Sequence, residues 1–188
     1  MKKNILSLAL LATGMFMACN SGSTNTPDAT VVAKDSNSVK FDTTDIKGDT
    51  KFAVAAADGG MLEIETSKLA LSKTGNPQIK DLAQMMIDDH TKAADKLKAL
   101  AAAKNITLPA TLSDDSQKKY DKLTGKTGID FDKAYADQMV SDHKDVIDAF
   151  KKESDNGNDS DLKTFATATL PTLEQHLAMS DSAKADLK

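Results

Sequence analysis

The sequence contains no arginine and no tryptophan, and it has only one cysteine and 4% aromatic residues. Without arginine there is no guanidinium group for two-point recognition of phosphate, and a net charge of −4 gives no attraction for nucleic acid. A single cysteine excludes a disulfide within the chain. Because aromatic residues are scarce, a core has to be built from Ala, Leu, Met, Ile and Val, and this composition favours helices over sheets.

Residues 1–18 have the pattern of a secretory signal, in which two lysines precede an apolar run that ends at Met17. That run is shorter than the roughly 20 residues needed to cross a membrane as a helix. A small residue then precedes Cys19, which resembles a bacterial lipobox and implies cleavage before Cys19 and attachment of lipid to it. An ordinary signal with an incidental cysteine is the alternative. We expect a lipoprotein of the cell envelope, anchored in a membrane by several acyl chains, facing the periplasm or lying at the outer membrane.

Residues 19–49 are rich in Ser, Thr, Asp and Asn and contain few apolar side chains. Such a segment buries too little surface to offset the entropy that it loses on ordering. We therefore predict a lipidated Cys19 followed by a flexible tether. A short docking strand around Val31–Val32 is the alternative. The helical domain is then expected at residues 50–184.

Four long stretches repeat their apolar residues at spacings of three and four, which is typical of amphipathic helices. These predicted helices cover residues 51–74, 76–104 and 130–153, and a fourth runs from residue 160 to a frayed end at 181–188. Asp130 is expected to cap the third helix, and Pro171 to kink the fourth. The connection at residues 105–130 contains a predicted short helix at 114–123, capped by Ser113. One crossover of this length fits an all-α fold of the ferritin-like four-helix bundle type, with a long crossover between the second and third helices.

Each of the four long helices carries one ionisable residue on its predicted buried face, near the middle of the helix. These residues are Glu63, His90, His143 and His176, and the chain has no other histidine. Midpoints of packed helices of similar length fall at similar heights, so we expect the four side chains to converge in one layer of the core. An unpaired buried carboxylate or imidazole is costly. The four groups would therefore satisfy one another as a hydrogen-bonded layer, or serve as ligands of a metal ion.

Four further residues lie close to the histidines along the sequence. Met86 and Met139 each precede a histidine by four residues and share its helix face. Their thioethers could act as soft ligands and favour copper, while the alternative is that they only fill the core. Asp89 and Asp142 point about 100° away from the adjoining histidines, so we expect them around the ligands or in solvent rather than among the ligands.

Several motifs of the predicted helices resemble those of a known family. The motifs are Met85-Met86-Ile87-Asp88-Asp89-His90, Phe131-Asp132-Lys133-Ala134-Tyr135, Asp142-His143 and Leu170-Pro171-Thr172-Leu173-Glu174-Gln175-His176-Leu177. Residues 52–183 thereby resemble a family of uncharacterised exported bacterial proteins, which are grouped as a domain of unknown function in the ferritin-like superfamily and are often described as outer-membrane proteins. The resemblance implies a ferritin-like four-helix fold and no particular activity.

The sequence differs from di-iron ferritin-like enzymes, which have a Glu three residues before His on two helices and a Glu on each of the others. Ile87, Val140 and Leu173 occupy the positions three before the histidines. We therefore expect zinc or copper, rather than iron, in the Glu/His cluster of a lipid-anchored envelope protein. The alternatives are a structural or interaction lipoprotein whose polar layer only fixes packing and, third, a ferritin-like oxidoreductase. The sequence identifies no substrate, protein partner or catalytic residue.

Overall fold

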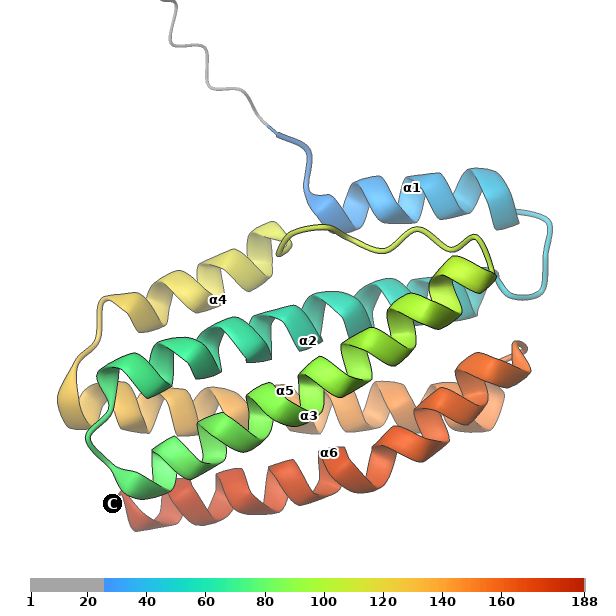
Figure 1. The fold of residues 1–188 in the computed structure, drawn as a ribbon. Coiled ribbons are helices and arrows are strands. Elements are labelled where there is room, and N and C mark those ends of the chain that lie inside the picture. The colour runs from blue at the N-terminus through green and yellow to red at the C-terminus, as the bar shows by residue number, and fades with distance from the viewer. Residues whose placement is uncertain (1–25, 188) are drawn as a thin grey trace, which may run out of the picture.

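The computed structural model describes residues 26–187, and this part of the chain forms six α-helices and no β-strand. The helices are α1 (Ala29–Phe41), α2 (Lys47–Lys73), α3 (Pro77–Ala103), α4 (Asp114–Thr124), α5 (Gly128–Asn156) and α6 (Ser160–Asp186). The prediction of an all-α protein is confirmed, and the long helices lie at the predicted places in the chain (Figure 1).

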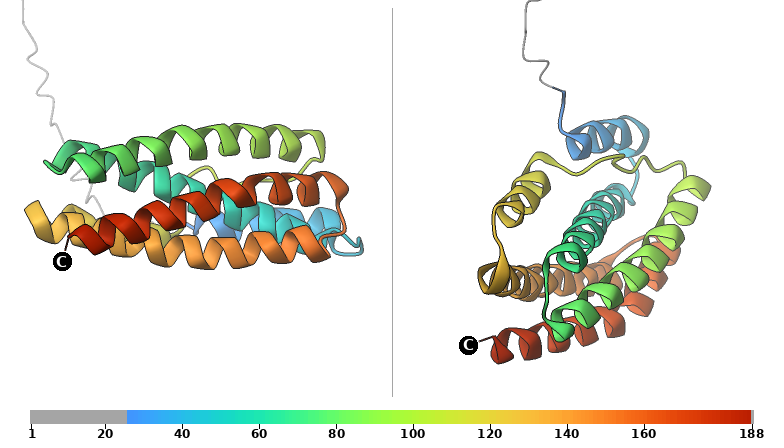
Figure 2. Two further views of the ribbon diagram at one scale, coloured as in Figure 1. Left: turned by 90° about the horizontal axis from the view of Figure 1, so that it is seen from below. Right: turned by 60° about the vertical axis from the view of Figure 1, so that its left-hand side comes forward.

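Helices α2, α3, α5 and α6 surround a common interior. In this ring α2 packs on α3, α3 on α6, α6 on α5, and α5 on α2. Helices α3 and α5 follow each other in the chain but are not neighbours in this ring. A long connection joins them, and it contains α4, which packs on the outside of α2 (Figures 1 and 2). This is the crossover with a short helix that the sequence predicted.

Two separate groups of apolar residues fill the interior. The first, which we call the Tyr135 cluster, contains Ala70, Ile79, Leu82, Ala83, Met86, Leu123, Phe131, Tyr135, Ala136, Met139, Ala183 and Leu187. The second, the Phe150 cluster, contains Ala53, Leu97, Ala101, Ile106, Ile147, Phe150, Leu162, Phe165, Ala166 and Leu173. Each long helix contributes to both clusters, so the polar residues near its middle lie between them.

Helix α1 corrects the prediction of a flexible tether for residues 29–41, and it also replaces the alternative of a strand at Val31–Val32. Residues 19–25 of the predicted tether lie outside the described residues. It packs on α2, and its buried Asn37 binds the backbone of Thr107 in the crossover. Asn37 Nδ2 donates to the Thr107 carbonyl oxygen over 2.8 Å, and Asn37 Oδ1 accepts from the Thr107 N–H over 2.7 Å. The segment is held by polar contacts, which its apolar content did not indicate.

Asp28 ties the start of α1 to the start of α4. Its Oδ1 accepts hydrogen bonds from the backbone N–H groups of Thr30 and Val31, which caps α1. Its Oδ2 accepts from the backbone N–H of Asp114 over 2.7 Å. One carboxylate therefore serves the first turns of two helices.

The structure confirms some of the predicted helix ends and corrects others. Ser113 caps α4 as expected, because its side chain accepts from the N–H of Ser116. The expectation for Asp130 is wrong: α5 begins two residues earlier at Gly128, whose φ of 55° favours glycine, and Asp130 lies in the first turn. The predicted fraying is also wrong for residues 181–186, since α6 runs to Asp186 with Ala183 buried in the Tyr135 cluster.

Pro171 lies inside α6 and supplies no backbone N–H to that helix. Figure 1 shows α6 changing direction along its length, which agrees with the predicted kink. The helix nevertheless continues past Pro171, and it carries His176 on its buried side.

Candidate metal centre

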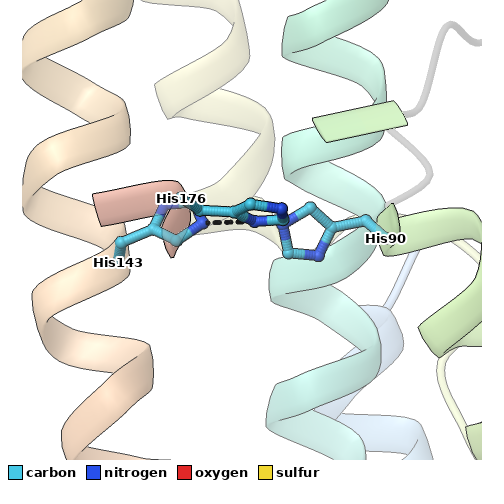
Figure 3. A group of neighbouring side chains, drawn as sticks. All are labelled: His90, His143 and His176. Carbon is cyan, nitrogen blue, oxygen red and sulfur yellow. Dashed lines mark hydrogen bonds between the residues drawn. The ribbon is translucent and has the colours of Figure 1, made fainter. Parts of the chain in front are cut away.

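The four residues that were expected to converge do meet, in a layer between the Tyr135 and Phe150 clusters. α2 contributes Glu63, α3 His90, α5 His143 and α6 His176, and none of these residues is more than 7% exposed. Figure 3 shows the three imidazole rings at one level, pointing toward one another from three helices. The layer follows from the sequence because each of the four residues replaces an apolar residue near the middle of a buried helical face.

His143 and His176 are in direct contact. His143 Nε2 lies 3.2 Å from His176 Nδ1 (Figure 3). The opposite nitrogen of each ring faces a hydrogen-bond acceptor: His143 Nδ1 is 2.9 Å from the backbone carbonyl oxygen of Met139, and His176 Nε2 is 3.3 Å from Asp89 Oδ2. A carbonyl oxygen and a carboxylate only accept, so these two outer nitrogens carry the protons of the neutral rings.

These tautomers leave a lone pair on each of the two inner nitrogens. When both rings are neutral, His143 Nε2 and His176 Nδ1 present lone pairs to each other with no proton between them. Two acceptors facing each other in a buried site are unfavourable. A cation between the nitrogens, either a shared proton or a metal ion, would remove this conflict.

Glu63 lies against the other two rings of the layer. Its Oε2 is 3.1 Å from His90 Nε2, and its Oε1 is 3.3 Å from His143 Nδ1. The first distance is within hydrogen-bonding range, but the direction is unsuitable, and His90 Nε2 has no hydrogen-bond partner among the described residues. The short distance alone does not make a hydrogen bond, because hydrogen bonds weaken steeply when donor and acceptor are poorly aligned. His90 Nε2 is thus a buried nitrogen whose hydrogen-bonding capacity is unused.

Burial sets the charge of the layer. It lowers the pKa of His90 and of His176 to about 4, and it lowers the pKa of His143 as well. Burial also raises the pKa of Glu63 to about 7, against the opposing effect of His143 and with a further increase from Asp142. At neutral pH the imidazoles are therefore neutral, which is the form that binds metal ions.

The two aspartates next to the histidines take different positions. Asp89 is partly exposed and contacts His176, so it orients that ring, as carboxylates around metal ligands do. Asp142 Oδ1 is 2.6 Å from Lys119 Nζ on α4, and its buried Oδ2 has no hydrogen-bond partner among the described residues. The sequence indicated that neither aspartate would be a primary ligand. It gave no sign of Lys119, because this pairing depends on how α4 packs.

Met86 and Met139 are completely buried members of the Tyr135 cluster. This position agrees with the interpretation that they fill the core. Their role as soft ligands stays a prediction.

The three histidines could hold a metal ion, since one nitrogen from each lies within 4.8 Å of the others. In tetrahedral zinc sites the Zn–N bonds are about 2.0–2.1 Å, which places two ligand nitrogens on one ion roughly 3.4 Å apart. The 3.2 Å between His143 Nε2 and His176 Nδ1 is close to that separation. The arrangement is thus suited to an ion bound by imidazole, although it does not fix which metal.

Residues 35–182 match the family described as "Domain of unknown function (DUF4142)". The chain belongs to the DUF4142 family. The match includes the four residues of the layer and begins inside α1, so the DUF4142 region extends into the segment predicted as a tether. Membership confirms the resemblance to a family of domains of unknown function, whereas the ferritin-like superfamily and export stay predictions. Searches of curated proteins and of solved structures gave no match.

The predicted membrane anchor is not tested by the fold. The signal at residues 1–18 and the lipidation site Cys19 lie outside the described residues. Within residues 26–187, no helix combines the length and the apolar character needed to cross a bilayer.

Proposed function

We propose that this protein binds one zinc or copper ion through His90, His143 and His176, with Glu63 as the fourth ligand. The observation that carries the proposal is the contact between His143 Nε2 and His176 Nδ1, whose outer nitrogens are both committed to acceptors. Burial makes a proton between these rings costly at neutral pH. A divalent or monovalent metal ion would accept both lone pairs at once.

The donor set supports zinc or copper rather than iron. Three imidazoles and one carboxylate are ligands that suit zinc and copper. The di-iron sites of ferritin-like proteins rely on more carboxylates, and Ile87, Val140 and Leu173 stand where further glutamates would be needed. The same ion would also give His90 Nε2, which is buried beside Glu63 without a hydrogen-bond partner, a group to bind.

The protein that carries this site is, in our proposal, a lipoprotein of the cell envelope with a ferritin-like four-helix bundle. The ring of α2, α3, α5 and α6 with one crossover supports the fold assignment. The sequence pattern around Cys19 supports the anchor. Mass spectrometry of the membrane fraction should find diacylglyceryl-modified Cys19, and an unmodified or uncut terminus would contradict this part.

A structural role for the layer is the main rival. The observation in its favour is that His143, His176 and Asp89 form a continuous row of contacts without any ion. Such a polar layer could fix the register of the helices between the two apolar clusters. An oxidoreductase is the third candidate, because a ferritin-like fold with a bound metal could support redox chemistry.

Metal analysis tests the proposal. The full chain would be purified without nickel resin or chelators, analysed for metal by mass spectrometry, stripped, and titrated with zinc, copper and iron. We expect one equivalent of zinc or copper, which is lost in Glu63→Gln and His176→Phe. Glu65→Gln is the matched control, because Glu65 lies on the same helix and is exposed. No metal and no tight titration would falsify metal binding and leave the structural role.

A further inference from the structure

An open groove of about 1160 Å³ lies between α1, α2, α4 and α5 and reaches the candidate metal centre from outside. Glu63 is part of its wall, whereas the three histidines are not. A second cavity of about 30 Å³ touches both Glu63 and His90. Both linings share Ala56, Glu63, Val146 and Phe150. Glu63 is therefore the one ionisable group that belongs both to the groove and to the space beside the histidines.

The groove has an excess of negative charge. Its lining contains nine carboxyl side chains and five lysines. A cleft lined mainly by one sign of charge concentrates ions of the opposite sign and raises their rate of association. The groove thus favours cations over anions along its length.

Lys119 and Asp142 form an ion pair in the wall of this groove. The Asp142 side chain is only 11% exposed, whereas that of Lys119 is 47% exposed. Both act on Glu63: Asp142 raises its pKa and Lys119 lowers it. The ammonium group of Lys119 therefore occupies a cation position in the wall of the same groove that Glu63 lines. Because its side chain is half exposed, Lys119 can swing into solvent without unfolding α4.

We propose that this groove is the route by which a divalent metal ion reaches the histidine layer, and that Lys119 closes its inner end by pairing with Asp142. The inference rests on the proposed function, since it concerns the same site. An arriving ion displaces Lys119 from Asp142, contacts the free Oδ2 of Asp142, and passes to Glu63 and then to the imidazoles. In this route Asp142 is a transient ligand of the passing ion, and Glu63 is a ligand of the final site.

The gate is tested by the kinetics of cobalt(II) binding to the metal-free full chain, followed in a stopped-flow instrument by the visible absorption of the bound ion. Lys119→Met should raise the association rate about tenfold, because the competing ammonium group is gone. Release of cobalt to a chelator should also become faster, since the same gate controls exit. Lys118→Met is the matched control: it removes the same charge from the same helix, and Lys118 pairs with the exposed Asp115 instead.

The route is tested separately by blocking it. Gly59 lines the groove and Gly60 lines the small cavity, and neither has a heavy atom within 4 Å of the position of a Cβ. Leucine at either position improves the helix propensity of α2, so both variants should fold, and circular dichroism would verify this. Gly59→Leu should slow cobalt binding severalfold, whereas Gly60→Leu should leave the rate close to that of the unaltered chain.

The outcomes separate the two proposals. If the unaltered chain takes up no cobalt, zinc or copper, metal binding and the route both fail. If it binds metal but Lys119→Met behaves like Lys118→Met, the gate is wrong while the site stands. Faster association with slower release in Lys119→Met would show a simple charge effect and also overturn the gate. Slowing by Gly60→Leu and not by Gly59→Leu would place the route on the other side of Glu63.

Discussion

His143 Nε2 and His176 Nδ1 face each other over 3.2 Å, while Met139 and Asp89 hold the opposite sides of the two rings. The backbone carbonyl orients one ring and a carboxylate orients the other. Asp89 is therefore an orienting contact that a substitution can remove without changing a proposed ligand, whereas the Met139 carbonyl cannot be removed by exchanging a side chain.

Asp89→Ala should therefore weaken zinc binding. Without the contact to His176 Nε2, neither the tautomer nor the orientation of that ring is fixed. Removal of such orienting groups typically lowers metal affinity about 10–100-fold. Competition against a zinc chelator measures the change. Asp88→Ala is the control, since Asp88 is exposed on the same turn of α3 and contacts Gln84. Equal affinities of the two variants would count against an orienting role for Asp89.

His90→Leu should make the metal-free protein less sensitive to acid. Burial lowers the pKa of His90 from its ordinary value of 6.5 to about 4, so between these values the unfolded chain gains a proton and the folded chain does not. Stability is thus lost as the pH falls from 6.5 toward 4, by about 2 kcal/mol at pH 5. Urea unfolding with chelator at pH 7.5 and pH 5 should show a smaller drop in the variant. A structural role for His90 predicts instead that the variant is less stable at both pH values.

Asn37→Ala should destabilise the fold by about 2 kcal/mol. The substitution removes two hydrogen bonds to the backbone of Thr107 and leaves the partly buried N–H and carbonyl of Thr107 without their partner. Denaturant unfolding would measure the loss, and limited proteolysis would show whether α1 detaches. Val39→Ala provides a control on the exposed side of α1, where Val39 is 88% exposed. If both variants resemble the unaltered chain, the contact between Asn37 and Thr107 contributes nothing to stability.

Gly157→Ala should destabilise the turn between α5 and α6. A Cβ at this position would lie 2.6 Å from Glu153 Oε1 and 2.7 Å from the Glu153 carbonyl oxygen, so the backbone has to shift. Overpacking of this kind costs about 1–3 kcal/mol. Gly60→Ala has open space at its Cβ inside α2, and it should instead raise the melting temperature slightly. Thermal unfolding of both variants compares the two effects, and a neutral Gly157→Ala would mean that the turn adapts freely.

The candidate site was predictable because it depends on two regular properties of helices. Periodicity assigned Glu63, His90, His143 and His176 to buried faces, and their central positions assigned them to one level. Features that depend on contacts between distant segments were not predictable. Helix α1 is held in place by the hydrogen bonds of Asn37 to the backbone of the crossover. The low apolar content of this segment gave no indication of such polar contacts. Lys119 resembles any surface lysine until α4 is packed beside α5.

The double role of Asp28 would limit how far the domain could move from a membrane if the chain is anchored at Cys19 as proposed. Asp28 joins α1 and α4 at the wall of the groove, and it follows Cys19 by only nine positions. A fully extended chain of that length reaches about 30 Å. An acyl anchor at Cys19 would therefore keep the mouth of the groove within a few nanometres of the lipid surface. The protein would then draw its ion from the thin layer of water next to the membrane, where anionic head groups concentrate cations.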